Sequence, residues 1–483
     1  MQVREAPLQL GQTPPAGGGT AGPSPRPGAL RVDLELVRKY NVPGPRYTSY
    51  PPATHFSDQT PPERLLEAVR ANNTVAGDLS LYFHLPFCYS LCWFCGCTTV
   101  ITTQQGQSAT YLDHLRKELA LLAPMLHRDR RVVQLHFGGG SPTFLLPEEL
   151  RALGRLIREH FTLDDHAEAG VEIDPRRLTR DHVIAMREAG FNRASLGVQD
   201  HNPVVQKAVH RIQPYEMTKQ SVDWVREAGF QSVNIDLIYG LPHQTPASFE
   251  RTLDEVLTLK PDRFAVFNYA YVPWIKPAQK IIKEETLPTA ETKLAILKLT
   301  SEKLTSEGFV YIGMDHFARA EDELAVAQRQ KTLQRNFQGY STRGGADIYA
   351  FGMSSISQAG DAYWQNQKEL PSYYAALDAG RLPIAKGYLL TDDDRVRRHT
   401  ILRLMCDLSL DFAALSRALG LDFSTYFAKE LASLEDLAGD GLLEHSTTGL
   451  TVTDLGRLFI RNIAMRFDAH LAKETERRYS RTV

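Results

Sequence analysis

The sequence contains little cysteine, and what it has is clustered. Five cysteines occur in 483 residues, and four of them lie between positions 88 and 97. An odd number of thiols crowded into one short stretch does not form the disulfide framework of a small exported domain. Clustered thiols that stay reduced usually bind metal or carry out redox chemistry, so the composition favours a cytoplasmic protein with one thiol-based centre.

The sequence also lacks long apolar runs and an excess of charge of either sign. No stretch approaches the roughly 20 apolar residues that span a bilayer, and residues 1–30 contain no apolar core of a signal peptide. The formal net charge of -2 gives no argument for affinity for nucleic acids or membrane surfaces. We therefore expect a cytoplasmic protein with no membrane or nucleic-acid partner.

The chain divides into four predicted regions. Residues 1–32 are rich in proline and glycine and predict a disordered tail, because such a stretch buries too little apolar surface to offset its ordering entropy. Residues 33–78 are the predicted N-terminal arm, within which residues 34–56 contain NVPGPRYTSYPPATHF and predict an ordered irregular segment rather than a helix or strand. Residues 79–390 predict a barrel with an extension, and residues 391–483 predict a helical domain that ends like a winged helix.

Short runs with strand character alternate with helical spacing in the first part of the barrel region. The predicted strands are residues 79–85, 132–137, 170–174, 193–199, 232–241 and 263–270. Gly190 and Gly229 stand where two of the intervening helices should end. Strands that alternate with helices favour a parallel sheet with right-handed crossovers. Six such units predict a (β/α)6 barrel that is incomplete compared with the closed eight-unit form.

The spacing Cys88-x3-Cys92-x2-Cys95 follows directly after the first predicted strand. Iron–sulfur cubanes are normally held by four thiolates, so three thiolates leave one iron without a protein ligand. The amino and carboxylate groups of S-adenosylmethionine can chelate that iron, and one electron from the cluster then releases methionine and a 5′-deoxyadenosyl radical. The alternatives are a structural zinc site, for which no second ligand pair is present, and a redox disulfide. The spacing assigns no role to Cys97.

Glycine and polar residues follow the other predicted strands, and the chemistry of a barrel is built where such strand ends converge. Three glycines in HFGGGSPT (136–143) let the backbone approach a ligand and offer N–H groups to it. The later strands end at Glu172, Asp174, Gln199, Asp200, Asp236 and Asn268. Each acid alone is better explained as a helix N-cap, but their recurrence on one rim predicts a binding site, since unpaired carboxylates are costly in a core. A methionyl carboxylate there would require a cation such as Arg211.

On these residues the chain resembles the radical S-adenosylmethionine enzymes. Cys88, Cys92 and Cys95 match the family signature, with the aromatic Phe94 before the last cysteine. The resemblance implies a parallel barrel that is often three-quarters complete, and a glycine motif that holds the amino group of the cofactor. The expected fold class is therefore α/β: an incomplete (β/α)6, three-quarter TIM-like barrel with an N-terminal arm and a mainly helical C-terminal domain.

From GPRYTSYPPA (44–53) to FIRNIAMRFDAHL (459–471) the chain resembles the oxygen-independent coproporphyrinogen III oxidases of haem biosynthesis. The other shared motifs are YFHLPFCYSLCWFCGC, LHFGGGSPT, VEIDPR, SLGVQD, NIDLIYGLP and QRNFQGYSTRGGADIYAFGMSSIS. The family usually has Thr where Ser141 stands, which keeps the hydroxyl, and YPTA where this chain has YPPA.

The resemblance implies a [4Fe-4S] cluster held by Cys88, Cys92 and Cys95, and two S-adenosylmethionine molecules. It assigns the cluster-bound molecule to Tyr82, Gly139, Glu172 and Ile356. It assigns the second molecule to Phe94, Gly140, Ser141, Gln199, Arg211, Asp236 and Ala270. The implied reaction converts two propionate side chains of coproporphyrinogen III to vinyl groups, giving protoporphyrinogen IX, without oxygen.

The partners expected from this reaction are the tetrapyrrole, an electron donor for the cluster and a terminal electron acceptor, and we expect a monomer. Arg46, Arg211 and Arg343 are candidates to meet the substrate carboxylates. The nearest alternative is the sister family of haem chaperones, whose members typically lack the GPRYTSYP arm and the fourth cysteine of CGC. DNA binding through the C-terminal wing is disfavoured, because DFSTYFAKELASLEDLAGDG (422–441) is acidic.

Overall fold

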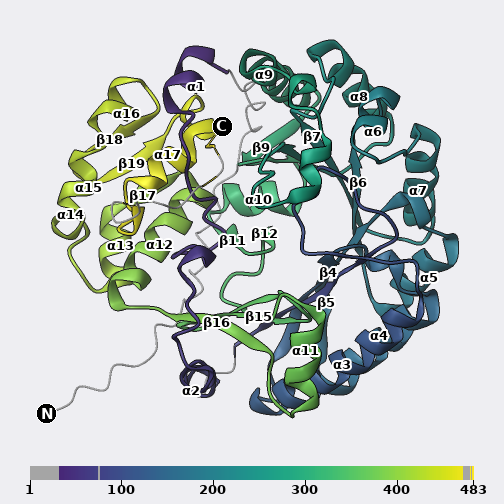
Figure 1. The fold of residues 1–483 in the computed structure, drawn as a ribbon. Coiled ribbons are helices and arrows are strands. Elements are labelled where there is room, and N and C mark those ends of the chain that lie inside the picture. The colour runs from purple at the N-terminus through teal and green to yellow at the C-terminus, as the bar shows by residue number, and fades with distance from the viewer. Residues whose placement is uncertain (1–31, 74–76, 472–478, 480, 483) are drawn as a thin grey trace, which may run out of the picture.

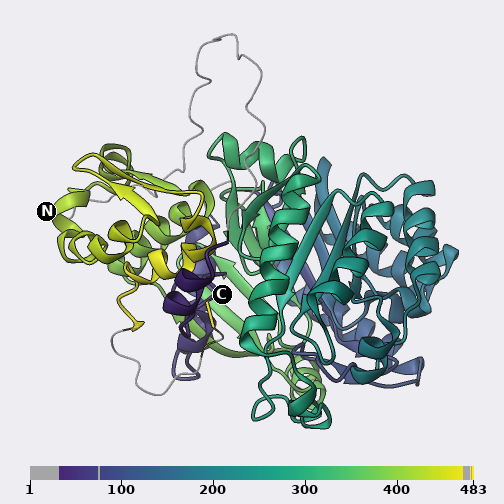
Figure 2. The same ribbon diagram turned by 90° about the horizontal axis from the view of Figure 1, so that it is seen from above.

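The computed structural model describes residues 32–73, 77–471, 479 and 481–482. The predicted disordered tail, apart from Val32, lies outside the described residues. Figure 1 shows a curved sheet with helices around its outer rim and a helical region at its open side. The N-terminal arm runs between these two parts, and the view from above in Figure 2 shows the same order.

All six predicted barrel strands are present and parallel. They pair in chain order and comprise β1 (Leu79–Leu85), β4 (Arg131–Gly139), β5 (Thr162–Ile173), β6 (Arg193–Gln199), β7 (Ser232–Tyr239) and β8 (Arg263–Asn268). In β6 and β7 buried residues alternate with partly exposed ones. One face therefore packs against the outer helices, while the other faces the interior of the barrel.

The helices of the barrel cover the outer face of the sheet (Figure 1). They are α3 (Gly106–Leu122), α4 (Pro147–His160), α5 (Arg180–Ala189), α7 (Tyr215–Glu227) and α8 (Pro246–Thr258), with the short α6 (Pro203–Ala208) after β6. α5 shows why the chain folds this way locally. The Thr179 side chain caps its N-terminus, and Gly190, with a φ of 104°, ends it as the sequence predicts.

The sheet continues beyond the six predicted units to a total of 12 strands. On one side lie β13 (Asp347–Phe351), which is parallel to β1, and the antiparallel β14 (Ile356–Ala359), β15 (Ala362–Asn366) and β16 (Ile384–Leu389). On the other side, after α9 (Ala290–Ser306), lie the antiparallel β10 (His316–Arg319) and β9 (Phe309–Gly313). The sequence pattern predicted an extension here but none of these strands.

A hairpin of β11 (Gln334–Asn336) and β12 (Gly339–Ser341) fills the interior of the barrel near the amino ends of its strands. Gln338 Nε2 donates to Ser80 Oγ at 3.2 Å, and Gln134 Nε2 donates to Ser341 Oγ at 3.2 Å. Ser80 lies at the start of β1, so the hairpin closes the interior at the edge opposite to the cysteine loop.

The arm is partly helical, contrary to the prediction of an irregular arm. α1 (Leu34–Tyr40) begins after Asp33, whose carboxylate caps it, and α2 (Pro62–Asn72) follows. Two buried arginines hold the segment between these helices by its backbone carbonyls. Arg335 donates to Arg46 O and Tyr47 O at 3.1 and 3.2 Å, and Arg461 donates to Pro45 O at 3.0 Å.

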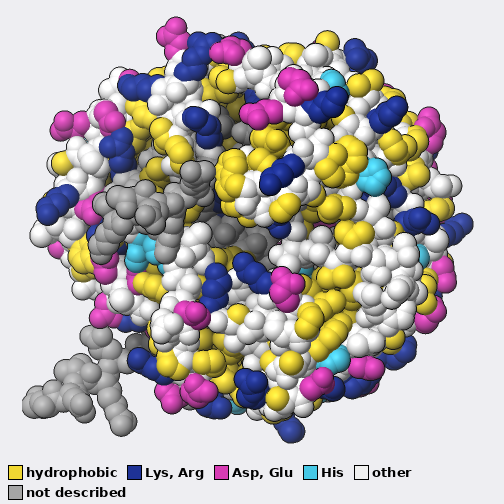
Figure 3. Space-filling view, viewed as in Figure 1, with side chains coloured by type: hydrophobic (Ala, Val, Ile, Leu, Met, Phe, Trp, Pro, Cys, Tyr) yellow, Lys and Arg dark blue, Asp and Glu magenta, His cyan; other side chains and the backbone are white. Residues whose placement is uncertain are grey.

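The C-terminal region is mainly helical, as predicted. It contains α12 (Asp392–Asp407), α13 (Phe412–Leu419), α14 (Phe423–Tyr426), α15 (Ala428–Ala432), α16 (Glu435–Gly439) and α17 (Ile460–Met465). A small antiparallel sheet of β17 (Ser409–Asp411), β19 (Gly449–Val452) and β18 (Leu443–His445) forms the predicted wing. In the described part of the chain no helix is long and apolar enough to cross a bilayer. Figure 3 shows basic and acidic side chains interspersed around the rim of one face, in keeping with the small net charge.

Candidate active site

Three cysteines lie on one loop at the carboxyl edge of the parallel sheet. Cys88 ends β2 (Phe87–Cys88), which pairs with β3 (Val100–Ile101), and Cys92 and Cys95 lie on the loop between these two strands. All three thiols are free, and Cys92 is buried. The loop follows β1 directly, so the structure places the predicted ligands where the other strand ends converge.

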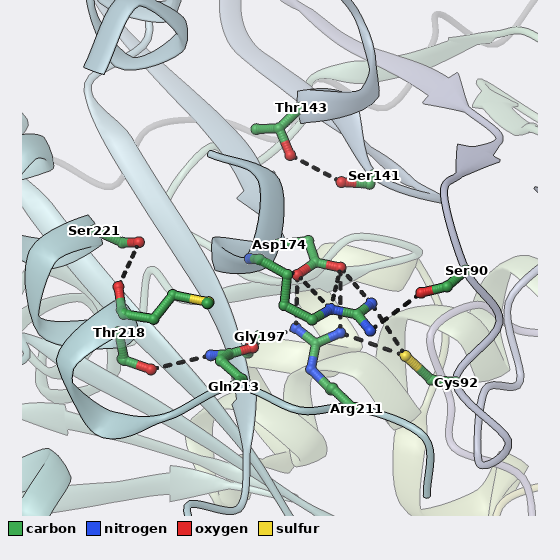
Figure 4. Close-up of polar contacts among 12 residues, drawn as sticks. Ser90, Cys92, Ser141, Thr143, Asp174, Gly197, Arg211, Gln213, Thr218 and Ser221 are labelled. Carbon is green, nitrogen blue, oxygen red and sulfur yellow. Dashed lines mark hydrogen bonds and ion pairs between the residues drawn. The ribbon is translucent and has the colours of Figure 1, made fainter. Parts of the chain in front are cut away.

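Two arginines surround the thiol of Cys92 (Figure 4). Arg176 Nη2 and Arg211 Nη1 lie 3.3 and 3.6 Å from its Sγ atom. Asp174 pairs with both arginines, at 2.6 Å from Arg176 and 3.4 Å from Arg211. Burial acts to raise the pKa of Asp174, but Arg211 and Arg176 outweigh it and hold the pKa well below its usual range. The two cations and Asp174 therefore form a charged network against the sulfur of Cys92.

The other thiols of the loop differ in their protonation. A hydrogen bond from the Cys97 side chain, only partly opposed by burial, lowers the pKa of Cys95 to about 6. Burial and the neighbouring Cys95 raise the pKa of Cys88 to about 12. Within the described residues no three potential ligands converge on one point to hold a single ion. The thiolates of a cubane each bind a different iron, so these residues fit a [4Fe-4S] cluster better than a zinc ion.

Glu172 of β5 meets the glycine motif inside the barrel. Its Oε2 atom accepts a hydrogen bond from Gly139 N at 3.1 Å, and its Oε1 atom lies 3.3 Å from His136 Nε2. Burial acts to raise the pKa of Glu172, but these contacts lower it overall. Tyr82 of β1 stacks on His136 with ring centroids 5.8 Å apart. The side chain of Glu172 is still 44% exposed, so its carboxylate is accessible to a ligand.

Asp236 of β7 lies close enough to Glu172 for the two carboxyl groups to interact electrostatically. It accepts hydrogen bonds from Ser195 Oγ at 3.0 Å and Asn234 Nδ2 at 2.7 Å. Burial, with the negative charge of Glu172 as a second cause, raises the pKa of Asp236 to about 7. A carboxyl group that changes charge near neutral pH can either accept or donate a hydrogen bond to a ligand hydroxyl.

A second set of predicted residues lies around Arg211. Arg211 Nη2 donates to Gly197 O at 2.6 Å, and a Cβ atom placed on Gly197 would lie 2.9 Å from Gln199 Nε2 and 3.1 Å from Arg211 Nη2. The side chains of Gln199 and Arg211 therefore meet over Gly197. A cavity of about 240 Å³ beside them is lined by Ser141 and Asp174 among others.

Phe94 and Ala270 are brought together by a residue that the sequence did not single out. Gln279 Nε2 donates to Phe94 O at 3.0 Å and to Ala270 O at 3.2 Å. Ile356, by contrast, begins β14 and packs in a separate apolar group with Tyr363 and Leu390.

The glycine motif does not offer the free N–H groups that the sequence predicted. Gly139 N donates to Glu172, Gly140 N donates to Leu85 O at 2.8 Å, and Ser141 N donates to Phe87 O at 2.9 Å. The glycines are needed because the chain passes so close to β1 that a Cβ atom on Gly140 would lie 2.5 Å from the backbone of Pro86. The backbone carbonyls of the glycine motif, rather than its N–H groups, are therefore the groups that can contact the amino group of a ligand.

Two other predicted polar residues have structural roles. Asp200 is 2% exposed and accepts hydrogen bonds from Asn202 N, Gln244 Nε2 and Thr252 Oγ1, so it holds the chain that leaves β6, whereas Asn202 is the N-cap of α6. Arg343 donates to His166 O in the amino-terminal half of β5, away from the carboxyl edge. The structure therefore does not bring Arg343 to the site.

Sequence reasoning missed His84, His136, Arg176 and Gln279. Three of them stand inside motifs already singled out: YFHLPFC, LHFGGG and VEIDPR. His84 follows the predicted Tyr82 by two residues on β1, and this spacing was a signal that both side chains lie on the same face of the strand. Gln279 lies in a segment without regular spacing and gave no signal.

Comparisons with known proteins agree with this geometry. Residues 82–256 match the radical SAM superfamily, and residues 390–459 match the HemN C-terminal domain. A protein of Synechocystis sp. named oxygen-independent coproporphyrinogen III oxidase is 48% identical over 94% of this chain and 98% of its own length. The protein of that name from Pseudomonas aeruginosa is 46% identical over 94% of this chain and 99% of its own. The chain belongs to the oxygen-independent coproporphyrinogen III oxidase family.

A solved structure of the same family extends the agreement to the fold. Coproporphyrinogen III oxidase (HemN) from Escherichia coli, described as a radical SAM enzyme, superimposes with a TM-score of 0.87 and 46% sequence identity. The match covers 92% of this chain and 100% of that one. Membership of this radical SAM family confirms the three-quarter barrel and the use of a [4Fe-4S] cluster with S-adenosylmethionine.

Proposed function

We propose that this chain catalyses the oxidative decarboxylation of two propionate side chains of coproporphyrinogen III to vinyl groups, giving protoporphyrinogen IX without oxygen. The observation that carries the proposal is the loop of Cys88, Cys92 and Cys95, with Arg176 and Arg211 against Cys92, at the rim of a parallel barrel. The names of the relatives reported above support coproporphyrinogen III as the substrate.

Cys88, Cys92 and Cys95 are the proposed ligands of the [4Fe-4S] cluster. When bound, the cluster and S-adenosylmethionine would supply a 5′-deoxyadenosyl radical able to abstract hydrogen from a propionate side chain, and the electron released with CO2 would pass to the terminal acceptor. Arg176 and Arg211 would stabilise the thiolate of Cys92 and hold Asp174 in place. The buried position of Cys92 would limit the access of water.

We further propose two S-adenosylmethionine molecules per chain. The cluster-bound molecule would contact Tyr82, Gly139, Glu172 and Ile356. The second would contact Phe94, Gly140, Ser141, Gln199, Arg211, Asp236 and Ala270. Glu172 and Asp236 would provide oxygen atoms for hydroxyl or amino groups, and Arg211 would provide a cation for a carboxylate.

The remaining proposals concern the setting of the enzyme. We propose a cytoplasmic monomer with residues 33–78 as the arm, 79–390 as the barrel with its extension, and 391–483 as a docking or lid domain that does not bind nucleic acid. It would require an electron donor and a terminal acceptor. Arg46 is the remaining candidate to bind a substrate carboxylate. It forms an ion pair with Asp315. The backbone carbonyl of Asp315 accepts a hydrogen bond from Val266 N, near the carboxyl end of β8, at 2.7 Å.

The experiment is anaerobic reconstitution with iron and sulfide, followed by incubation with S-adenosylmethionine, dithionite, coproporphyrinogen III and an electron acceptor. We expect 5′-deoxyadenosine and the divinyl product together, detected by chromatography and mass spectrometry. Tight haem binding without vinyl formation would contradict the proposal and favour a haem chaperone.

A further inference from the structure

Exposed apolar side chains gather around the cysteine loop. Nine large apolar side chains are exposed in the described part of the chain, and six of them lie on three segments beside this loop. These six are Ile101, Val204, Ile212, Trp274, Ile275 and Ile281. Trp274 and Ile275 are 57% and 59% exposed. Such a concentration on one part of a surface marks an interaction site rather than the ordinary scatter of apolar residues.

The three segments, residues 88–102, 203–212 and 274–283, contact one another and form what we call the cluster-side surface. Lys276 Nζ donates to Cys97 O at 3.0 Å. Trp93 N donates to Val209 O at 3.1 Å, and the rings of Trp93 and His210 stack 5.2 Å apart.

A buried apolar group supports these segments from below. Trp93 and Phe94 pack against Val205, Val209 and Ile282. The exposed side chains are therefore carried on a packed base that includes the cysteine loop itself.

Within its three segments the charge of the cluster-side surface is of one sign, and the exposed Glu284 and Glu285 begin directly after Lys283. None of its three segments contains Asp or Glu, although the whole chain has 57 acidic residues. The segments carry Lys207, Lys276, Lys280 and Lys283. A shallow depression of about 510 Å³, lined by Val204, Lys207 and His243 among others, adjoins them. Apolar contacts within a rim of lysines complement a partner with an acidic rim.

We propose that the cluster-side surface docks an acidic one-electron carrier protein, a reduced flavoprotein or iron–sulfur protein, that reduces the cluster. This inference rests on the proposed function, in which each cleavage of S-adenosylmethionine consumes one electron. The carrier is oxidised by one electron as the cluster is reduced by one, and no bond forms or breaks in that step. The surface includes the cysteine loop, so a carrier docked there lies at the shortest approach to the cluster.

The test compares two electron sources on the reconstituted full-length enzyme: dithionite, which needs no docking surface, and reduced flavodoxin as the acidic protein probe. The variants are the double charge reversal Lys280→Glu/Lys283→Glu and Ile275→Ser. The controls are Lys368→Glu and Ile184→Ser, which alter exposed residues outside the three segments. The rate of 5′-deoxyadenosine formation is measured at low and high ionic strength.

We expect the charge reversal to lower the flavodoxin-dependent rate about tenfold at low salt and less at high salt, because screening weakens the charge complementarity. The dithionite-dependent rate of the charge-reversal variant should stay within about twofold of the wild-type rate. The two control variants should match the wild type with either electron source. An unchanged flavodoxin-dependent rate would overturn the inference. An equal loss in both arms would also overturn it, and would indicate that the surface serves the tetrapyrrole or the fold. Absence of 5′-deoxyadenosine from the wild type with dithionite would instead contradict the proposed function.

Discussion

Arg211 holds its guanidinium against the thiol of Cys92, with Nη1 3.6 Å from Sγ. The side chain of Arg211 is only 8% exposed and also pairs with Asp174. A buried cation between a cysteine sulfur and a carboxylate is unlike the surface arginines of the chain. It couples the cysteine loop to the ends of β5 and β6.

Replacing this arginine should therefore damage use of the cofactor more than binding of iron. We expect Arg211→Ala to lower 5′-deoxyadenosine formation by at least about tenfold while iron per chain stays near the wild-type value, since the three thiols remain. Arg211→Lys keeps the charge but not the forked geometry, and should recover only part of the rate. Undiminished turnover in Arg211→Ala would contradict this role.

The glycine at position 140 offers a steric test of the loop. In Gly140→Ala the added methyl group would lie 2.5 Å from the backbone of Pro86, which leads directly into Cys88. We expect iron incorporation to fall and the melting temperature to drop. Gly96→Ala is the matched control on the cysteine loop itself, because a Cβ atom on Gly96 meets nothing within 4 Å. Equal iron content in the two variants would rule out this explanation.

A buried ion pair joins the arm, the loop before β4 and the extension. Arg130, with a side chain 1% exposed, pairs with Asp347 at 2.6 Å, and Asp347 also accepts from Asn72 Nδ2 at 2.8 Å. We expect Arg130→Ala to lower the free energy of unfolding by about 3–5 kcal/mol, because it leaves a buried carboxylate without its cation. The neighbouring Arg131 is 50% exposed, so Arg131→Ala should change the free energy of unfolding by about 1 kcal/mol or less. Urea denaturation measures both.

Glu118 should make stability depend on pH. Burial raises its pKa to about 7 from an ordinary 4.5, although Tyr373, Gly352 N and Asn366 donate to its oxygens. The folded state then keeps a proton that the unfolded state loses, so the free energy of unfolding should fall as pH rises from about 4.5 to 7. The slope from this group is at most about 1.4 kcal/mol per pH unit.

Glu118→Gln, which has no proton to lose, should lack this contribution, whereas the exposed Glu63→Gln should keep it. The measurement is denaturant unfolding at several pH values. Parallel pH profiles for the wild type and Glu118→Gln would contradict the assignment.

The barrel was predictable from sequence because its signals are local. The strand Leu79–Leu85 and the strand Arg193–Gln199 have the predicted bounds, since each is an apolar run set between turn residues. The strands of the extension were missed because β13 pairs with the distant β1, and the short strands that follow it in a Gly- and Ser-rich segment carry little periodicity. α1 was missed because the Pro-rich stretch that follows it dominates the composition of the arm.

The candidate site was predictable as a set of residue types and not as a network of contacts. The cysteine spacing identified the loop, but spacing alone does not reveal that Arg176 reaches Cys92 from another strand end. Similarly, three consecutive glycines suggested free N–H groups, whereas β1 and Glu172 accept their hydrogen bonds. Long-range pairing of this kind depends on tertiary packing.

The most direct measurement of the central claim is 5′-deoxyadenosine formation by Cys92→Ala beside Cys406→Ala, after identical anaerobic reconstitution. Cys406 is a buried thiol in a separate apolar cluster, so its replacement removes a cysteine without touching the proposed ligands. We predict that Cys406→Ala cleaves S-adenosylmethionine like the wild type and that Cys92→Ala holds no intact cluster and forms no 5′-deoxyadenosine. Full 5′-deoxyadenosine production by Cys92→Ala would contradict the account.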